Sequence, residues 1–214
     1  IMKIIFYIIP FFLISSVTHA HTYTGMIGFY DGLSHPVLAF DHFLAMVSVG
    51  IISAQIGGRA IWTIPFTFVL IMIVGGLIGI YAEMNQLLKS AALNEIGQTF
   101  ILADFLYLLI EIGILVSVIV LGLAIAIEKK LPVGITMIFI GIFGFFHGSA
   151  HGLEMPWAAN PFLFALGFAT GTATLHIFGV IIGYFAIKTK LSIVLLRMTG
   201  ICFAGIGIYS LINL

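Results

Sequence analysis

Charged side chains are scarce in this chain of 214 residues: Asp, Glu, Lys and Arg together make up 7% of it, while hydrophobic residues make up 62%. So little charge cannot supply the solvated surface of an ordinary soluble domain. The mean hydropathy of +1.26 and the repeated apolar runs of about 20 residues, the length that crosses a bilayer, indicate an integral membrane protein.

Other residue types and motifs that are rare or absent exclude further classes of function. Basic and acidic residues balance, and no basic block is interleaved with aromatic residues, so nucleic acid is not expected as a partner. The single cysteine, Cys202, can form neither an intrachain disulfide nor a thiolate metal cluster. No nucleotide-binding motif is present, so ATP hydrolysis by this chain is not expected. The sequence leaves no room for a soluble catalytic domain and calls for no prosthetic group, so we do not expect an enzyme.

The first twenty residues have the layout of a secretory signal peptide. Lys3 precedes an apolar run, residues 4–14, and the small residues Thr18 and Ala20 occupy the two positions that cleavage requires. We therefore predict a signal peptide over residues 1–20 and cleavage after Ala20, which would expose His21 at the new N-terminus. An uncleaved anchor helix is the alternative.

The remaining residues, 21–214, predict one all-α transmembrane domain with six helices and short loops. We expect the helices at Val37 to Gln55, Trp62 to Tyr81, Phe105 to Ile127, Pro132 to His151, Phe162 to Ile187 and Leu191 to Leu214. The polar stretch from Glu83 to Asp104 is expected to be a loop.

The loops differ in charge between the two sides of the membrane. The first, third and fifth loops contain five basic residues, Arg59, Lys129, Lys130, Lys188 and Lys190, whereas the opposite side contains only Lys89. The positive-inside rule therefore places the odd loops in the cytoplasm. This orientation predicts an inner-membrane protein whose mature N-terminus lies on the periplasmic or extracellular side.

Two sets of polar residues interrupt the apolar helices. Asp41 and His42 lie in the first predicted helix, and His35 precedes it, just before Pro36. In the fourth predicted helix, His147 and His151 are spaced i, i+4, so they share one face. Ionisable groups in lipid are costly unless they face one another, water or an ion. Because the two helices run in opposite directions, we expect the two sets to converge in the outer half of the membrane, as metal ligands or, alternatively, as a proton carrier or a helix-packing pair.

Further polar residues could extend this site. Glu154 continues the face of His147 and His151 towards the outer loop. His21, Glu111, Ser117, Thr170, Thr174 and His176 are expected in pathway or supporting roles, with His176 as a deeper station about 20 Å below the outer end. The threonines, Thr172 among them, could equally bond their own helix carbonyls.

Imidazole and carboxylate groups without thiolates suit a borderline divalent ion: Ni²⁺, Co²⁺, Zn²⁺ or Cu²⁺. The chemistry of the ligands does not choose among these metals. Protons compete with the metal for imidazole, so binding should weaken as the pH falls through the histidine range.

Several spaced motifs resemble the HupE/UreJ family of nickel permeases. They are His35-Pro36-x5-Asp41-His42, then Gly57-Gly58-Arg59-Ala60-x-Trp62-x-x-Pro65, and finally His147-Gly148-x-Ala150-His151-Gly152-x-Glu154-x-Pro156. The resemblance implies secondary uptake of Ni²⁺ or Co²⁺ for nickel enzymes such as hydrogenase or urease. On this basis we expect capture by His35, His151 and Glu154, binding by Asp41, His42 and His147, and passage past His176.

Two other classes of function stay open at this stage. An intramembrane zinc hydrolase would hold Zn²⁺ with three of these groups and activate water with a carboxylate such as Glu154, although the sequence lacks His-Glu-x-x-His. A metal-binding accessory protein would bind without transporting. The bilayer and a divalent ion are the expected partners in either case, and a homo-oligomer is compatible with all three readings.

Overall fold

The computed structural model describes residues 28–93, 96–128, 131–153 and 160–214, with the side chains of residues 86–104 excepted. Within these ranges all regular structure is helical, which confirms the all-α class. The helices are α2 (Phe29–Leu38), α3 (Phe40–Ile56), α4 (Ala60–Leu93), α5 (Ile96–Ile127), α6 (Val133–Leu153), α7 (Pro161–Ala186) and α8 (Lys190–Ile212). The predicted signal peptide, His21 and Glu154 lie outside the described residues.

Five of the described helices, α4 to α8, are long and apolar enough to cross a membrane. The pair α2 and α3 passes the same test as a unit, but it is bent by 84° at its junction. Taken as one broken span, this pair completes the six spans that the hydropathy pattern predicts. The outward faces of these helices carry large apolar side chains such as Phe66, Leu77 and Ile138, as contact with lipid requires. The chain is an integral membrane protein.

The first span begins earlier than predicted and is broken. His35 and Pro36 were expected just before the helix, but the structure places both inside α2, and the break falls at Ala39. Pro36 has no backbone N–H to donate within the helix, and α2 ends two residues later, at Leu38. Asp41, in the first turn of α3, accepts a hydrogen bond from the His42 backbone N–H at 2.8 Å and so supports a new helix start.

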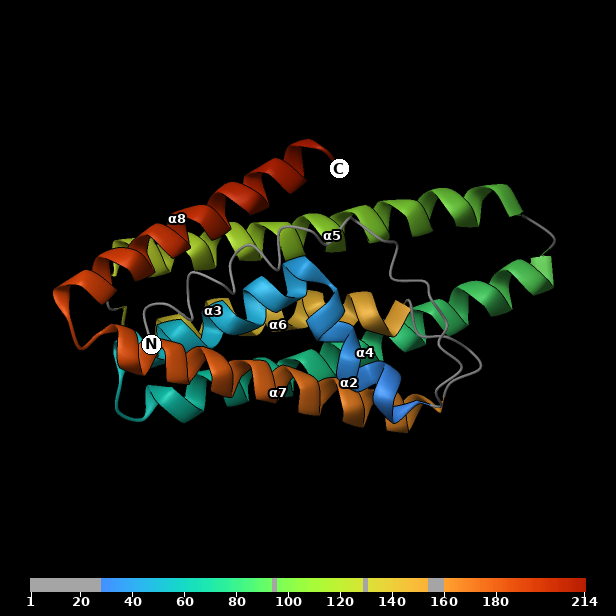
Figure 1. Cartoon of the computed structure of the whole chain (residues 1–214). Helices are drawn as coiled ribbons and strands as arrows, with labels where there is room; N and C mark the ends of the chain where they lie inside the picture. Colours follow the sequence, from blue (N-terminus) through green and yellow to red (C-terminus); the bar gives the residue numbers. More distant parts are fainter. Residues whose placement is uncertain (1–27, 94–95, 129–130, 154–159) are drawn as a thin grey trace.

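The connection between the second and third predicted helices also differs. Residues 83–104 were expected to be a loop, yet α4 continues to Leu93 and α5 begins at Ile96. Residues 83–93 contain neither glycine nor proline, and all of them except Asn85 and Ser90 are good helix formers, so they favour continued helix despite their polarity. In Figure 1 both helices extend past the ends of their neighbours.

Helix α3 forms the centre of the bundle and is buried along almost its whole length. It contacts α4, α5, α6 and α7. Glycines allow the closest pairs: a Cβ at Gly148 of α6 would collide with the Met72 carbonyl of α4, and one at Gly32 of α2 would collide with the Phe164 carbonyl of α7. Such backbone contact is typical of helix packing in membranes. As a result α2 lies across α7 while the other helices run along the bundle (Figure 1).

Candidate metal centre

Four histidine side chains from three helices meet inside the bundle, near the bend between α2 and α3. The ring centroids of His35 on α2 and His151 on α6 lie 4.5 Å apart. His42 on α3 lies 4.6 Å from His151 and 4.9 Å from His147, also on α6. The predicted convergence of the two histidine sets is therefore confirmed. We call His35, His42, His147 and His151 the histidine cluster.

The sequence of α6 explains how it presents two histidines at once. His147 and His151 lie one turn apart on a face that points into the bundle. The residue after each is a glycine, and these glycines, Gly148 and Gly152, contact the backbone of α4. Because successive residues are turned by about 100° around a helix, the glycine side packs on α4 while the histidine side faces α3.

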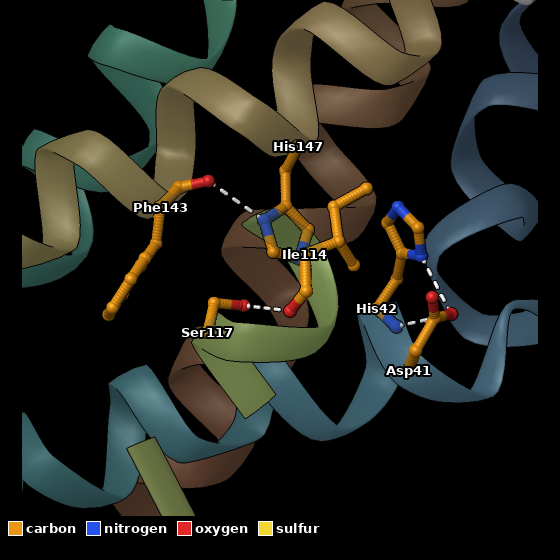
Figure 2. Close-up of polar contacts among 6 residues, drawn as sticks. All are labelled: Asp41, His42, Ile114, Ser117, Phe143 and His147. Atoms are coloured by element: carbon orange, nitrogen blue, oxygen red, sulfur yellow. Dashed lines mark hydrogen bonds and ion pairs between the residues drawn. The ribbon is translucent and has the colours of Figure 1, made fainter. Parts of the chain in front are cut away.

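The ring of His147 is anchored by its own helix. Its Nδ1 lies 2.8 Å from the Phe143 carbonyl oxygen, which can only accept, so Nδ1 carries the proton (Figure 2). Nε2 is therefore the unprotonated nitrogen of the neutral ring. It is buried and has no hydrogen-bond partner among the described residues. A lone pair fixed in this way, with the opposite nitrogen bonded to a carbonyl, is the usual arrangement of a metal-binding histidine.

Asp41 anchors the second histidine. Asp41 Oδ1 lies 2.8 Å from His42 Nδ1 as well as from the His42 backbone nitrogen. The carboxylate thus accepts a hydrogen bond from Nδ1–H of His42. Nε2 of the same ring is then the nitrogen that could coordinate an ion. Figure 2 shows the rings of His42 and His147 at the same level, with Asp41 on the side of His42 that is away from His147. Carboxylate, imidazole and metal in series is a common arrangement, in which Asp41 would orient the His42 ring; the direct coordination by Asp41 that the sequence predicts stays a prediction.

His151 lies between His35 and His42 and is held only by packing. Its ring contacts those of His35 and His42 and lies 4.1 Å from the ring of Phe168 on α7. Both of its nitrogens are buried without a hydrogen-bond partner among the described residues. An unpaired buried polar atom costs about 1 to 3 kcal/mol, a loss that a bound cation would offset. This ring can rotate without breaking a hydrogen bond.

The nitrogen atoms of the histidine cluster are not arranged as a complete coordination sphere around one ion. In the part of the chain that the structure describes, no three His, Cys, Asp or Glu side chains have donor atoms placed to hold one ion. The histidine rings pack edge to face or tilted, as aromatic rings do. Binding therefore requires rings to turn, and His151 is the ring best able to do so.

A further buried histidine lies beyond the cluster. His176 on α7 is 1% exposed, and neither of its nitrogens has a hydrogen-bond partner within the described ranges. Phe68 on α4 separates it from the cluster: the Phe68 ring lies 5.4 Å from that of His147 and 5.1 Å from that of His176. The prediction of a separate station for His176 agrees with this geometry. Phe68 itself was not singled out, since nothing in the sequence distinguishes it among twenty phenylalanines.

The other predicted residues do not join the cluster. Glu111 is exposed on α5. Thr170 and Thr174 are exposed on α7 and donate hydrogen bonds to carbonyls of their own helix, which was the alternative reading. Ser117, which is buried, also donates a hydrogen bond to a carbonyl of its own helix, that of Ile114 in α5. Thr172 is buried, and its hydroxyl lies 3.7 Å from the sulfur of Met72.

Comparison with known proteins identifies the family of the chain. The family model described as HupE / UreJ protein matches residues 9–88 and 82–210 of the chain. A curated relative, Protein HupE of Rhizobium leguminosarum bv. viciae, is 35% identical over 165 residues, which cover 77% of this chain and 75% of the relative. No solved structure matches. The chain, with its histidine motifs and its membrane-spanning helices, belongs to the HupE/UreJ family.

Proposed function

We propose that this protein is a permease of the inner membrane that takes up a divalent transition-metal ion, Ni²⁺ or in second place Co²⁺, for the assembly of nickel enzymes such as hydrogenase or urease. The observation that carries the proposal is the buried histidine cluster, in which His147 Nε2 and both nitrogens of His151 have no hydrogen-bond partner among the described residues. Unpaired imidazole nitrogens in the membrane interior mark an ion site.

The order of the histidines gives the direction of the pathway. The charges of the loops favour an orientation with α2 at the outer side, and we place the mature N-terminus there, after cleavage at Ala20. The ion is then captured by His35 and His151, with Glu154 beside them as the sequence suggests. Rotation of His151 passes it to His42 and His147, which Asp41 and the Phe143 carbonyl hold in place.

At each transfer step, the ion leaves one imidazole ligand and binds another. The ion therefore never faces lipid, and part of its hydration shell is replaced by neutral nitrogen donors. Beyond the cluster, Phe68 closes the way to His176. A shift of the Phe68 ring would allow the ion to reach His176 and continue inward.

Flux in liposomes tests the proposal directly. The purified protein should carry radioactive Ni²⁺ into vesicles, and the His147→Gln and His42→Gln variants should lose this flux while keeping their helical content. The exposed Thr170→Ala variant is the control and should transport normally. Stoichiometric metal binding by the wild-type protein without any flux would contradict the proposal and indicate an accessory metal-binding role.

A further inference from the structure

A second polar region lies in the half of the bundle away from α2. A cavity of about 190 Å³ lies between α3, α5 and α6. Three residues with side-chain oxygen atoms line it, Gln55, Glu128 and Thr136, and the rest of its wall is apolar. We propose that this cavity is the exit site of the permease, a water-filled chamber in which Glu128 holds a hydrated divalent cation before its release. This inference rests on the proposed function.

The cavity begins where the histidine cluster ends. Phe143 lines it, and the carbonyl of Phe143 accepts the hydrogen bond from His147 Nδ1. From Phe143 the lining continues along α6 to Thr136 and then to Leu131 at the beginning of the helix. At 1.5 Å per residue, the stretch from Phe143 to Thr136 covers roughly 10 Å of depth. Cluster and cavity together therefore cover the distance from α2 to the opposite end of the bundle.

The hydroxyl of Thr136 donates to the Pro132 carbonyl at 3.3 Å, a common bond of a helical threonine, so the polarity of this region rests mainly on Gln55 and Glu128. Gln55 is 7% exposed and Thr136 is 6% exposed, in helices that are apolar throughout this depth. Gln55 donates one hydrogen bond, from Nε2 to the Ile125 carbonyl oxygen at 3.3 Å. The Gln55 side chain lines the cavity, so water inside the cavity would bond its amide oxygen.

Glu128 supplies the charge and is paired with a competing cation. Arg197 of α8 donates to Glu128 Oε2 at 2.9 Å, and the side chains are 48% and 24% exposed respectively. A half-exposed pair of this kind is weak, since water screens it. A divalent ion that arrives from the cluster can therefore displace Arg197, and the return of Arg197 would then help to expel the ion.

The two regions offer different ligand chemistry. Imidazole nitrogens bind late first-row divalent ions strongly, whereas carboxylate, amide and hydroxyl oxygens leave much of the hydration shell in place. An ion that moves from the cluster to the cavity thus passes from a tight site to a loose one. This is the order that net release on the cavity side requires.

A larger hollow on the protein provides a matched comparison. It lies between α4 and α6, measures about 540 Å³, and is lined by Thr67, Ile138 and further residues without charge. Thr67 donates to the Thr63 carbonyl of its own helix. This apolar hollow is where lipid is expected, so its residues serve as controls for those of the cavity.

Cysteine accessibility tests whether the cavity holds water and cation. In a Cys202→Ser background, Thr136→Cys and Ala124→Cys place thiols in the cavity, and Ile138→Cys places one in the apolar hollow. A positively charged, membrane-impermeant thiol reagent added to the cavity side of inverted vesicles should label the two cavity variants and leave the Ile138→Cys variant unlabelled. Saturating Ni²⁺ should slow the labelling of the cavity variants. Equal resistance of all three variants would mean that lipid fills the cavity and would overturn the inference, as would labelling that Ni²⁺ leaves unchanged.

The Glu128→Gln variant tests the role of the charge. Uptake should slow by about tenfold, the effect of losing one charge-assisted contact, while Ni²⁺ affinity at the histidine cluster stays unchanged. Uptake at the wild-type rate in this variant would overturn the role of Glu128. The two proposals fail separately: absence of Ni²⁺ flux in the wild-type protein contradicts the permease, whereas normal flux with an unlabelled cavity contradicts only the exit site.

Discussion

The buried histidines of this protein fall into two kinds. His42 and His147 each have Nδ1 bonded to an oxygen acceptor, Asp41 in one case and the Phe143 carbonyl in the other. His151 and His176 have no hydrogen bond at either nitrogen among the described residues and are held by aromatic neighbours, Phe168 and Phe68. The first kind has a fixed lone pair, while the second can turn.

In the proposed permease, the anchored and the unanchored histidines would have different tasks. A permease must hold its ion long enough to select it and must then let it go. Anchored rings meet the first requirement because their tautomer and direction are set before the ion arrives. Unanchored rings meet the second, since their rotation breaks no hydrogen bond. Along the pathway proposed above, from His151 to His42 and His147 and then to His176, the two kinds alternate as a stepwise transfer would need.

Removal of an anchored ring should have the largest effect. In the His147→Ala variant the Kd for Ni²⁺ should rise by at least about 100-fold, because a preoriented ligand is lost along with its bond to Phe143. Isothermal titration in detergent measures this affinity, and Thr170→Ala on the exposed face of α7 is the control. Unchanged affinity in a folded His147→Ala protein would remove His147 from the site.

Loss of Asp41, which anchors His42, should weaken Ni²⁺ binding less than loss of a histidine ring. The Asp41→Asn variant keeps the shape of the side chain but removes the charge that makes His42 a better donor. We expect Ni²⁺ affinity to fall by about 10- to 100-fold, the usual effect of changing such a supporting carboxylate. The Glu111→Gln variant, which neutralises an exposed carboxylate on α5, should bind normally. An equal loss in both variants would point to overall charge and against an anchor.

The backbone contact behind the anchored ring can be tested by stability. In the Gly148→Ala variant the new Cβ would meet the Met72 carbonyl, so α6 must move away from α4. We expect the free energy of unfolding to fall by about 1 to 3 kcal/mol. Gly134 on the same helix has no atom within 4 Å of an added Cβ, so Gly134→Ala should not destabilise the protein. Thermal melting in detergent compares the two, and identical melting temperatures would contradict the close contact.

Removal of His176, the unanchored ring beyond the cluster, should have the smallest effect on Ni²⁺ binding. In the His176→Ala variant we expect Ni²⁺ uptake to slow by about fivefold while the Kd at the cluster stays within about twofold of the wild-type value, because Phe68 separates the two. Stopped-flow or tracer uptake measures the rate, and titration measures the affinity. A large loss of affinity would place His176 in the same site as His147 and remove the distinction between them.

Much of this arrangement could be predicted from the sequence. The i, i+4 spacing of His147 and His151 and the opposite directions of two spans were enough to predict that the histidine sets meet. The hydropathy pattern located the spans, because a bilayer demands long apolar segments. The break at Ala39 was not predictable from that pattern, since hydropathy reports which residues favour lipid and carries no information about the bend between two short helices.

What the sequence determined by itself is the membrane location, the helical class, the family and the identity of the histidines, because these depend on composition and on spacing along one helix. Only the tertiary structure decided which histidines are anchored, that Asp41 supports His42, that Phe68 separates His147 from His176, and that Gln55, Glu128 and Thr136 share a cavity. These relations join side chains on different helices or depend on the rotation of a ring. The relations between helices are fixed by how closely the glycine faces allow the helices to approach, a distance set by packing between helices and not by any one segment alone.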